Sequence, residues 1–144
     1  MDVIIQAILH SALLIYVAIK DVQTREISPY LCLGVACLSL FHFQAENLLG
    51  LGIAMIVYVC AVWICPEQLG GGDMKLIASV SVVLGFTATA YGLIIAFILE
   101  LIKFQMIRRK LQKQEAGQDG LPLAPFLTVG FLITYFMKLG GLIL

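Results

Sequence analysis

The sequence has very few charged residues. Of its 144 residues, 12% are Asp, Glu, Lys or Arg, whereas 61% are hydrophobic. A soluble domain carries about a quarter charged residues and about half apolar ones, and a small water-soluble fold has too much surface to cover with so few polar side chains. This shortage excludes an ordinary soluble protein. It predicts one all-α domain over residues 1–144, a polytopic integral-membrane helical bundle with the lipid bilayer around it.

The sequence also lacks the patterns of metal and nucleic-acid sites. Its 4 cysteines include no C-x-x-C pair, so neither a zinc motif nor a redox motif is expected. We therefore predict no metal and no cofactor. The 9 Lys and Arg residues form clusters between apolar runs, not the continuous basic face that a nucleic-acid partner requires. The clusters are typical of topology signals in a membrane protein.

The beginning of the chain has no positively charged region. The first apolar run, Val3–Ile19, comes before its nearest basic residue, Lys20. A cleaved secretory signal has the opposite order, with the basic residues first. The order found here predicts an uncleaved first helix with its N-terminus outside.

The remaining apolar runs predict about six transmembrane helices, since about 20 apolar residues span a bilayer. The uncharged run after Asp73 is too long for one crossing. A single helix over 73–108 would extend about 54 Å, whereas the hydrocarbon core is about 30 Å thick. Two crossings with a turn within Gly85–Gly92 fit better. All Lys and Arg residues except Lys138 then lie on the cytoplasmic side, in the segments 20–29, 65–75 and 103–120.

This topology places two carboxylates at one depth. Asp21 ends the first helix and Asp73 begins the fourth, so both are expected at the cytoplasmic edge of the bundle. Ionisable residues at membrane depth are costly and are candidates for function. Two carboxyl groups a few ångströms apart share one proton. The ionised partner can then activate a water molecule while the protonated one polarises a carbonyl oxygen, which is the chemistry of aspartic peptide hydrolysis.

Three glycines, Gly70, Gly71 and Gly72, come directly before Asp73. Glycine allows backbone conformations that other residues avoid, and it lets another chain approach closely. The run therefore fits either a surface on which an extended peptide lies or a flexible loop with Asp73 as a helix N-cap. Lys75 is either a favourable neighbour for the negative charge of the pair or an interfacial anchor.

These residues resemble a known family, the type IV prepilin peptidases, which are integral-membrane aspartic proteases. Gly70 to Lys75 is similar to the family's G-x-G-D-x-K motif. Asp21-x-x-x-Arg25-x-Ile27 is similar to its first catalytic motif, with Ser28-Pro29 standing where Ile-Pro-Asn would continue. The stretch 121–130 resembles the P-x-x-P-F-L-x-x-G run before the last helix.

The resemblance implies that Asp21 and Asp73 are the catalytic pair and that Arg25, Lys75 and the three glycines contact substrate. It implies cleavage of short basic leaders from prepilin or pseudopilin precursors, at the cytoplasmic face of a bacterial inner membrane. The paired C-x-x-C motifs of the long, N-methylating members are absent. The chain is therefore similar to the short, peptidase-only form associated with tight-adherence (Flp) pili. The sequence sets no oligomeric state.

Two other classes of protein fit part of the pattern. A small proton-coupled transporter or channel component would use Asp21 and Asp73 as a proton relay. Such proteins place their acids near the bilayer midplane and have repeated halves, whereas here both acids lie at one interface. A membrane assembly factor whose glycines serve helix packing would explain the glycines but not the Asp that follows them.

Overall fold

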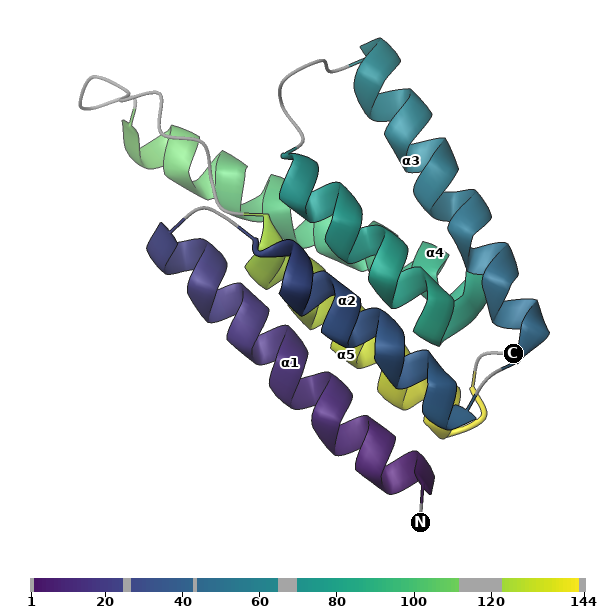
Figure 1. The fold of residues 1–144 in the computed structure, drawn as a ribbon. Coiled ribbons are helices and arrows are strands. Elements are labelled where there is room, and N and C mark those ends of the chain that lie inside the picture. Colours follow the sequence, from purple (N-terminus) through teal and green to yellow (C-terminus); the bar gives the residue numbers. More distant parts are fainter. Residues whose placement is uncertain (1, 25–26, 43, 65–69, 112–122, 143–144) are drawn as a thin grey trace.

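The computed structural model describes residues 2–24, 27–42, 44–64, 70–111 and 123–142, and within these ranges every regular element is a helix. Figure 1 shows five α-helices that run roughly parallel or antiparallel to one another. Two short 3₁₀ helices lie between the second and third of them. In chain order the elements are α1 (Asp2–Thr24), α2 (Pro29–Cys37), η1 (Leu38–His42), η2 (Ala45–Leu49), α3 (Gly50–Ile64), α4 (Gly71–Leu111) and α5 (Ala124–Leu139).

The outer surface of these helices is suited to lipid. Three helical stretches are long and apolar enough to cross a membrane, namely Ile4–Thr24, Ala45–Trp63 and Gly71–Ile107, and Pro29–Phe41 and Ala124–Leu139 are shorter apolar helices. Large apolar side chains face outward along them, with Trp63 84% exposed and Leu40 74% exposed. Apolar surface of this extent is stable only in a non-aqueous environment or against a partner. The chain is therefore a membrane protein.

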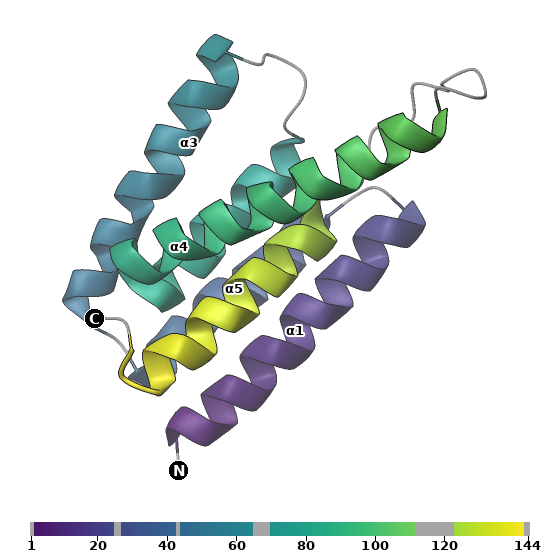
Figure 2. The same cartoon turned by 180° about the vertical axis from the view of Figure 1, so that it is seen from behind.

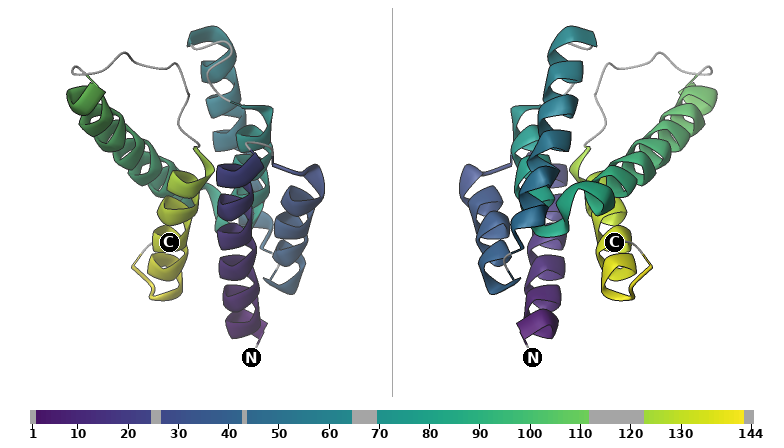
Figure 3. Two further views of the ribbon diagram at one scale, coloured as in Figure 1. Left: turned by 90° about the vertical axis from the view of Figure 1, so that its left-hand side faces the viewer. Right: turned by 90° about the vertical axis from the view of Figure 1, so that its right-hand side faces the viewer.

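Helix α4 bends sharply at Gly85. This residue has φ 79° and ψ −176°, which interrupts the helical dihedral angles. A positive φ of this kind is open to glycine at little steric cost. Figure 3 shows that the second arm of α4 runs back toward the end of the molecule at which the first arm begins. The bend lies inside the interval in which the sequence predicts a turn. The number of crossings and the side of the N-terminus stay predictions.

Two polar side chains from other elements stabilise this bend. The Lys138 ammonium group donates hydrogen bonds to the Leu84 carbonyl oxygen at 2.8 Å and to Asn47 Oδ1 at 3.0 Å. The Asn47 side-chain amide donates to the Val83 carbonyl oxygen at 3.2 Å. Carbonyl groups at the end of a helix have no helical partner, and a cation there also interacts favourably with the helix dipole. Lys138 and Asn47 therefore cap the first arm of α4.

The core is built around α4 and contains buried side chains from all five α-helices. Figure 2 shows α5 lying between α1 and the second arm of α4. Leu14 on α1, Ile77 on α4 and Phe131 on α5 are fully buried there. The Thr128 hydroxyl donates a hydrogen bond to the Leu14 carbonyl oxygen at 3.1 Å. Polar side chains that bond across helices in this way satisfy groups that lipid cannot.

Gly130 and Gly92 allow α5 to approach the second arm of α4. A Cβ atom at residue 130 would collide with the Gly92 carbonyl oxygen and lie 3.1 Å from the Ala96 nitrogen. A Cβ atom at residue 92 would lie 2.6 Å from the Phe131 ring. Small residues at a helix contact let two backbones come close, which is a common basis of helix packing in membranes.

Two helix ends lie elsewhere than the apolar runs suggest. Asp21 was expected to end the first helix, but α1 continues to Thr24, so Asp21 lies inside its last turn. The last apolar run, 123–144, continues beyond α5, which ends at Leu139 and is followed by a turn with Gly141 at φ 71°. Apolar residues continue beyond the true end of α5, and hydrophobicity alone cannot mark where a helix stops.

The close contact at Gly130 gives a prediction about stability. We expect Gly130→Ala to lower the stability of the protein in detergent by about 1–3 kcal/mol, because the added methyl group must displace the backbone of α4. Gly52→Ala on α3 is the matched control, since a Cβ atom there meets nothing within 4 Å.

Thermal unfolding of the two purified variants, followed by size-exclusion chromatography after heating, measures the difference. Gly52→Ala should be neutral or slightly stabilising because alanine favours a helix over glycine. Equal melting temperatures for the two variants would contradict the packing of α5 against α4.

Candidate active site

One pocket brings together most of the residues that the sequence singled out. It has a volume of about 280 Å³ and is lined by Asp21, Ile27, Gly70, Gly71, Gly72, Asp73 and Lys75. The last turn of α1 forms one side and the first turn of α4 forms another. Figure 1 shows that the end of α1 and the beginnings of α2, α4 and α5 all lie at the same end of the molecule. The topology therefore places residues from distant parts of the chain around one small cavity.

Asp21 is buried, with 7% of its surface exposed. Its Oδ2 atom accepts a hydrogen bond from the backbone N–H of Ala124 at 3.2 Å. Ala124 is the first residue of α5, so this N–H is one of the groups that the helix itself leaves without a partner. The positive end of a helix dipole also favours a negative charge. The beginning of α5 thus positions the Asp21 carboxyl group and directs a backbone donor at it.

Asp73 is the third residue of α4, which begins at Gly71. Its carboxyl group reaches back to the residue before the helix, since a Cβ atom at residue 70 would lie 3.2 Å from Asp73 Oδ2. An acidic side chain at the third position of a helix is placed as in a capping box. Asp73 is therefore not the N-cap residue itself, which was one of the two interpretations of the sequence.

The two carboxyl groups lie close enough to interact electrostatically. The Oδ1 atom of Asp73 is buried and has no hydrogen-bond partner in the structure. Buried polar atoms almost always have a partner, and one that lacks it is a site for water, a ligand or a reacting group. Asp21 and Asp73 thus line one pocket, and one carboxyl oxygen of Asp73 is buried without a hydrogen-bond partner.

The three glycines have different surroundings. A Cβ atom at residue 72 would lie 3.0 Å from Ile27 Cβ, and one at residue 70 would lie 3.2 Å from Asp73 Oδ2, whereas one at residue 71 would meet nothing within 4 Å. Among the described glycines, positive φ angles occur at Gly85 and Gly141 alone. Gly70–Gly72 therefore use none of the unusual backbone angles that glycine allows, and the close contact at Gly72 is with Ile27 of the same chain. The approach of a substrate peptide to this run stays a prediction.

Two residues that the sequence assigned to substrate binding, Lys75 and Arg25, remain to be placed. Lys75 lies on the pocket wall but is exposed to its surroundings. Arg25 lies outside the described residues, so its role stays a prediction. Among the described residues, no three His, Cys, Asp or Glu side chains gather into a group that could hold a metal ion.

Sequence reasoning did not assign the roles that three residues have in the site. Ile27 forms the wall against which Gly72 packs, and the Ala124 N–H holds Asp21. Glu100, on the second arm of α4, is a third carboxyl group close enough to act electrostatically on Asp73. A backbone N–H leaves no trace in the residue type, and Glu100 is brought near Asp73 only by the bend at Gly85.

The fold and the pocket define the class of protein. It is an α-helical membrane protein with two acidic residues in a pocket at the end of the molecule where α1 ends and α2, α4 and α5 begin. A comparison with known families makes this specific. Residues 8–104 match the type IV leader peptidase family, and this match covers about two thirds of the chain. The chain belongs to the type IV leader peptidase family and is a peptidase. No curated protein and no solved structure matches it.

The contact between Gly72 and Ile27 gives a prediction about activity. We expect Gly72→Ala to lower the rate of precursor cleavage by about tenfold to a hundredfold, because the added Cβ atom must push the first turn of α4 away from Ile27. A displacement of about 1 Å at a reacting group can reduce a rate by about a hundredfold. The measurement is cleavage of a co-expressed candidate prepilin over time.

Gly71→Ala is the matched control in the same glycine run. Its Cβ atom points into open space, so cleavage should stay within about twofold of wild type, the scale of a surface substitution. If Gly71→Ala and Gly72→Ala reduce cleavage equally, the Ile27 contact does not position Asp73.

Proposed function

We propose that this chain is an aspartic endopeptidase that removes the leader from prepilin or pseudopilin precursors, with Asp21 and Asp73 as its catalytic pair. Residues 1–144 would act as one transmembrane peptidase domain. The observation that carries the proposal is the single pocket in which both carboxyl groups meet. Membership of the leader peptidase family supports the reaction class, and the pocket supports the choice of residues.

The two carboxyl groups have unlike surroundings, which suits this chemistry. Asp21 is held at the positive end of α5 by the Ala124 N–H, an environment that favours its ionised form. Asp73 has a buried oxygen with no partner, and a proton there can be donated to a substrate carbonyl group. One ionised and one protonated carboxyl group together activate water and polarise the scissile peptide bond. The proton belongs to the pair and changes places during the reaction.

The other pocket residues serve the substrate in this proposal. Gly70 and Gly71 leave the entrance of the pocket without side chains, so a peptide backbone can approach Asp73 closely. Lys75 lies on the same wall, where its charge favours the negative charge of the pair. Arg25 is assigned to substrate contact on its place in the Asp21-x-x-x-Arg25-x-Ile27 motif alone.

The cellular location follows from the distribution of basic residues. Lys20, Lys75 and Lys103 come from segments that the positive-inside rule places on the cytoplasmic side. The helix ends that surround the candidate site lie together at one end of the molecule. We therefore assign the chain to the bacterial inner membrane as a multi-pass protein, with its site at the cytoplasmic face. Its partners are the precursor peptide and the surrounding lipid.

The transporter alternative uses the same two acids as a proton relay. It requires a path of polar groups from the pair toward the opposite face. The family match favours the peptidase, and both acids line a pocket at one end of the molecule. The alternative therefore gains no support from the arrangement.

Asparagine substitutions test the pair. Asn keeps the size of Asp but cannot ionise, so we expect Asp21→Asn and Asp73→Asn each to reduce cleavage of a co-expressed prepilin by more than about a thousandfold. The measurement is the size of the pilin band, and membrane insertion of each variant is checked by fractionation. A variant that inserts normally and still processes several prepilins would remove its residue from the catalytic pair.

The double variant adds a second criterion. Residues that act as one catalytic unit are not additive, so Asp21→Asn together with Asp73→Asn should be no slower than either single variant. A further loss of the same size in the double variant would show that the two acids act independently.

A further inference from the structure

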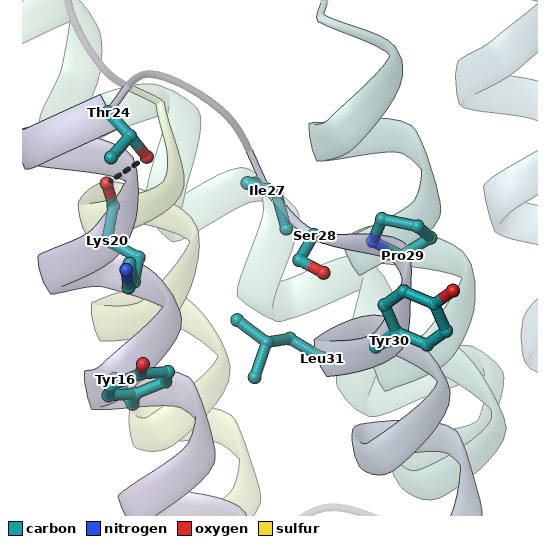
Figure 4. A pocket seen from close by; sticks show the side chains of 8 residues that line it. All are labelled: Tyr16, Lys20, Thr24, Ile27, Ser28, Pro29, Tyr30 and Leu31. Carbon is teal, nitrogen blue, oxygen red and sulfur yellow. Dashed lines mark hydrogen bonds between the residues drawn. The ribbon is translucent and has the colours of Figure 1, made fainter.

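A second cavity lies beside the candidate site, between α1 and the beginning of α2. It has a volume of about 570 Å³, within the range of about 300–1,000 Å³ that is usual for ligand sites. We call it the α1–α2 groove. Figure 4 shows its lining residues: Tyr16, Lys20, Thr24, Ile27, Ser28, Pro29, Tyr30 and Leu31.

The α1–α2 groove adjoins the candidate site. Ile27 lines both cavities, so it forms the boundary between them. Lys20 in the groove and Asp21 in the site are consecutive residues of α1. The catalytic pocket alone, at about 280 Å³, lies below the usual size of a ligand site. A polypeptide cut at Asp21 and Asp73 must therefore continue beyond this pocket.

The shape of the groove fits a short length of extended chain. Tyr16, Lys20 and Thr24 are spaced four residues apart, so they line up along one face of α1, and Figure 4 shows Leu31 reaching toward them from α2. This row is about 12 Å long at 1.5 Å per residue. An extended peptide covers that length with about four residues.

The groove also offers hydrogen bonds to a peptide backbone. The hydroxyl groups of Tyr16, Tyr30 and Ser28 line it, and such groups can both donate and accept. The Thr24 hydroxyl donates a hydrogen bond within α1, to the Lys20 carbonyl oxygen at 2.9 Å. Ser28 precedes α2, but its hydroxyl makes no capping hydrogen bond to that helix. Backbone N–H and C=O groups need partners wherever water is scarce. The groove therefore offers a peptide backbone hydrogen-bonding partners along a lining that also includes apolar side chains.

We propose that the α1–α2 groove is the substrate-binding extension of the active site, and that it holds about four residues of the precursor on one side of the scissile bond. Among the described residues that line it, Lys20 has the cationic side chain, so we expect the bound segment to carry a carboxylate. This inference rests on the proposed function, because it takes the Asp21–Asp73 pocket as the place of cleavage.

Photocrosslinking tests occupancy of the groove without relying on cleavage. The photoreactive amino acid p-benzoylphenylalanine replaces Tyr16 in the groove or Tyr58 on α3, in full-length protein co-expressed with an epitope-tagged candidate prepilin. The two tyrosines are matched, since they are 48% and 54% exposed. We expect an adduct with the precursor from position 16 that is at least fivefold stronger than from position 58.

Equal adducts at the two positions, or adducts at position 16 that contain lipid alone, would overturn the proposal. The catalytic assignment is judged separately. If the Asp→Asn variants still cleave the precursor while position 16 crosslinks to it, the groove stands and the catalytic pair fails. If instead the Asp→Asn variants fail to cleave and position 16 does not crosslink to the precursor, the catalytic pair stands and the groove is not a substrate site.

Charge reversal tests the role of Lys20. We expect Lys20→Glu to raise the KM for a precursor that has an acidic residue near the cleavage site by at least fivefold, with little change in kcat. Replacing that acidic residue with Lys should restore the KM, and Lys20→Arg should retain most of the affinity. A KM that is unchanged in Lys20→Glu, or that no acid-to-Lys change in the precursor restores, would show that Lys20 does not bind the substrate.

Discussion

The bend at Gly85 is the constraint on which the rest of the fold depends. It lets one continuous apolar stretch run to one end of the molecule and back, but it interrupts the hydrogen bonds of the helix at Val83 and Leu84. Lipid cannot satisfy these carbonyl groups. Asn47, from the element before α3, and Lys138, from the end of α5, supply the missing donors. The bend, the start of α3 and the end of α5 are thereby fixed to one another.

The opposite end of the molecule depends on the same arrangement. Because the second arm of α4 returns toward Gly71, α5 packs along it and begins beside the end of α1. The N–H of Ala124 can then reach the carboxylate of Asp21. Gly130 and Gly92 allow the close contact on which this packing rests. The positions of the two candidate catalytic acids are thus linked, through α5, to a hydrogen-bonded cap at the far end of the bundle.

The glycine run before Asp73 shows that a sequence motif can mark important positions without revealing the contact that requires glycine there. The sequence predicted either unusual backbone angles or close approach by another chain. In the structure Gly72 is the second residue of a regular helix, and its missing side chain makes room for Ile27. Gly71, between the two crowded positions, faces open space. This agrees with a G-x-G-D pattern in which the middle position is variable, and the reason lies in a contact between residues 45 positions apart.

The sequence by itself determined the helical class, the membrane environment and a turn near Gly85, and it proposed Asp21 and Asp73 as the candidate catalytic pair. Each of these follows from local composition or from a motif. Long apolar runs indicate a lipid environment, and a glycine permits a positive φ. An acidic residue in an apolar chain is rare enough to indicate function. Only the tertiary structure decided that Ile27 packs on Gly72, that Ala124 holds Asp21, and that Lys138 caps the bend. These are contacts between distant segments, and two of them use backbone atoms that every residue possesses. No property of a single position could have revealed them.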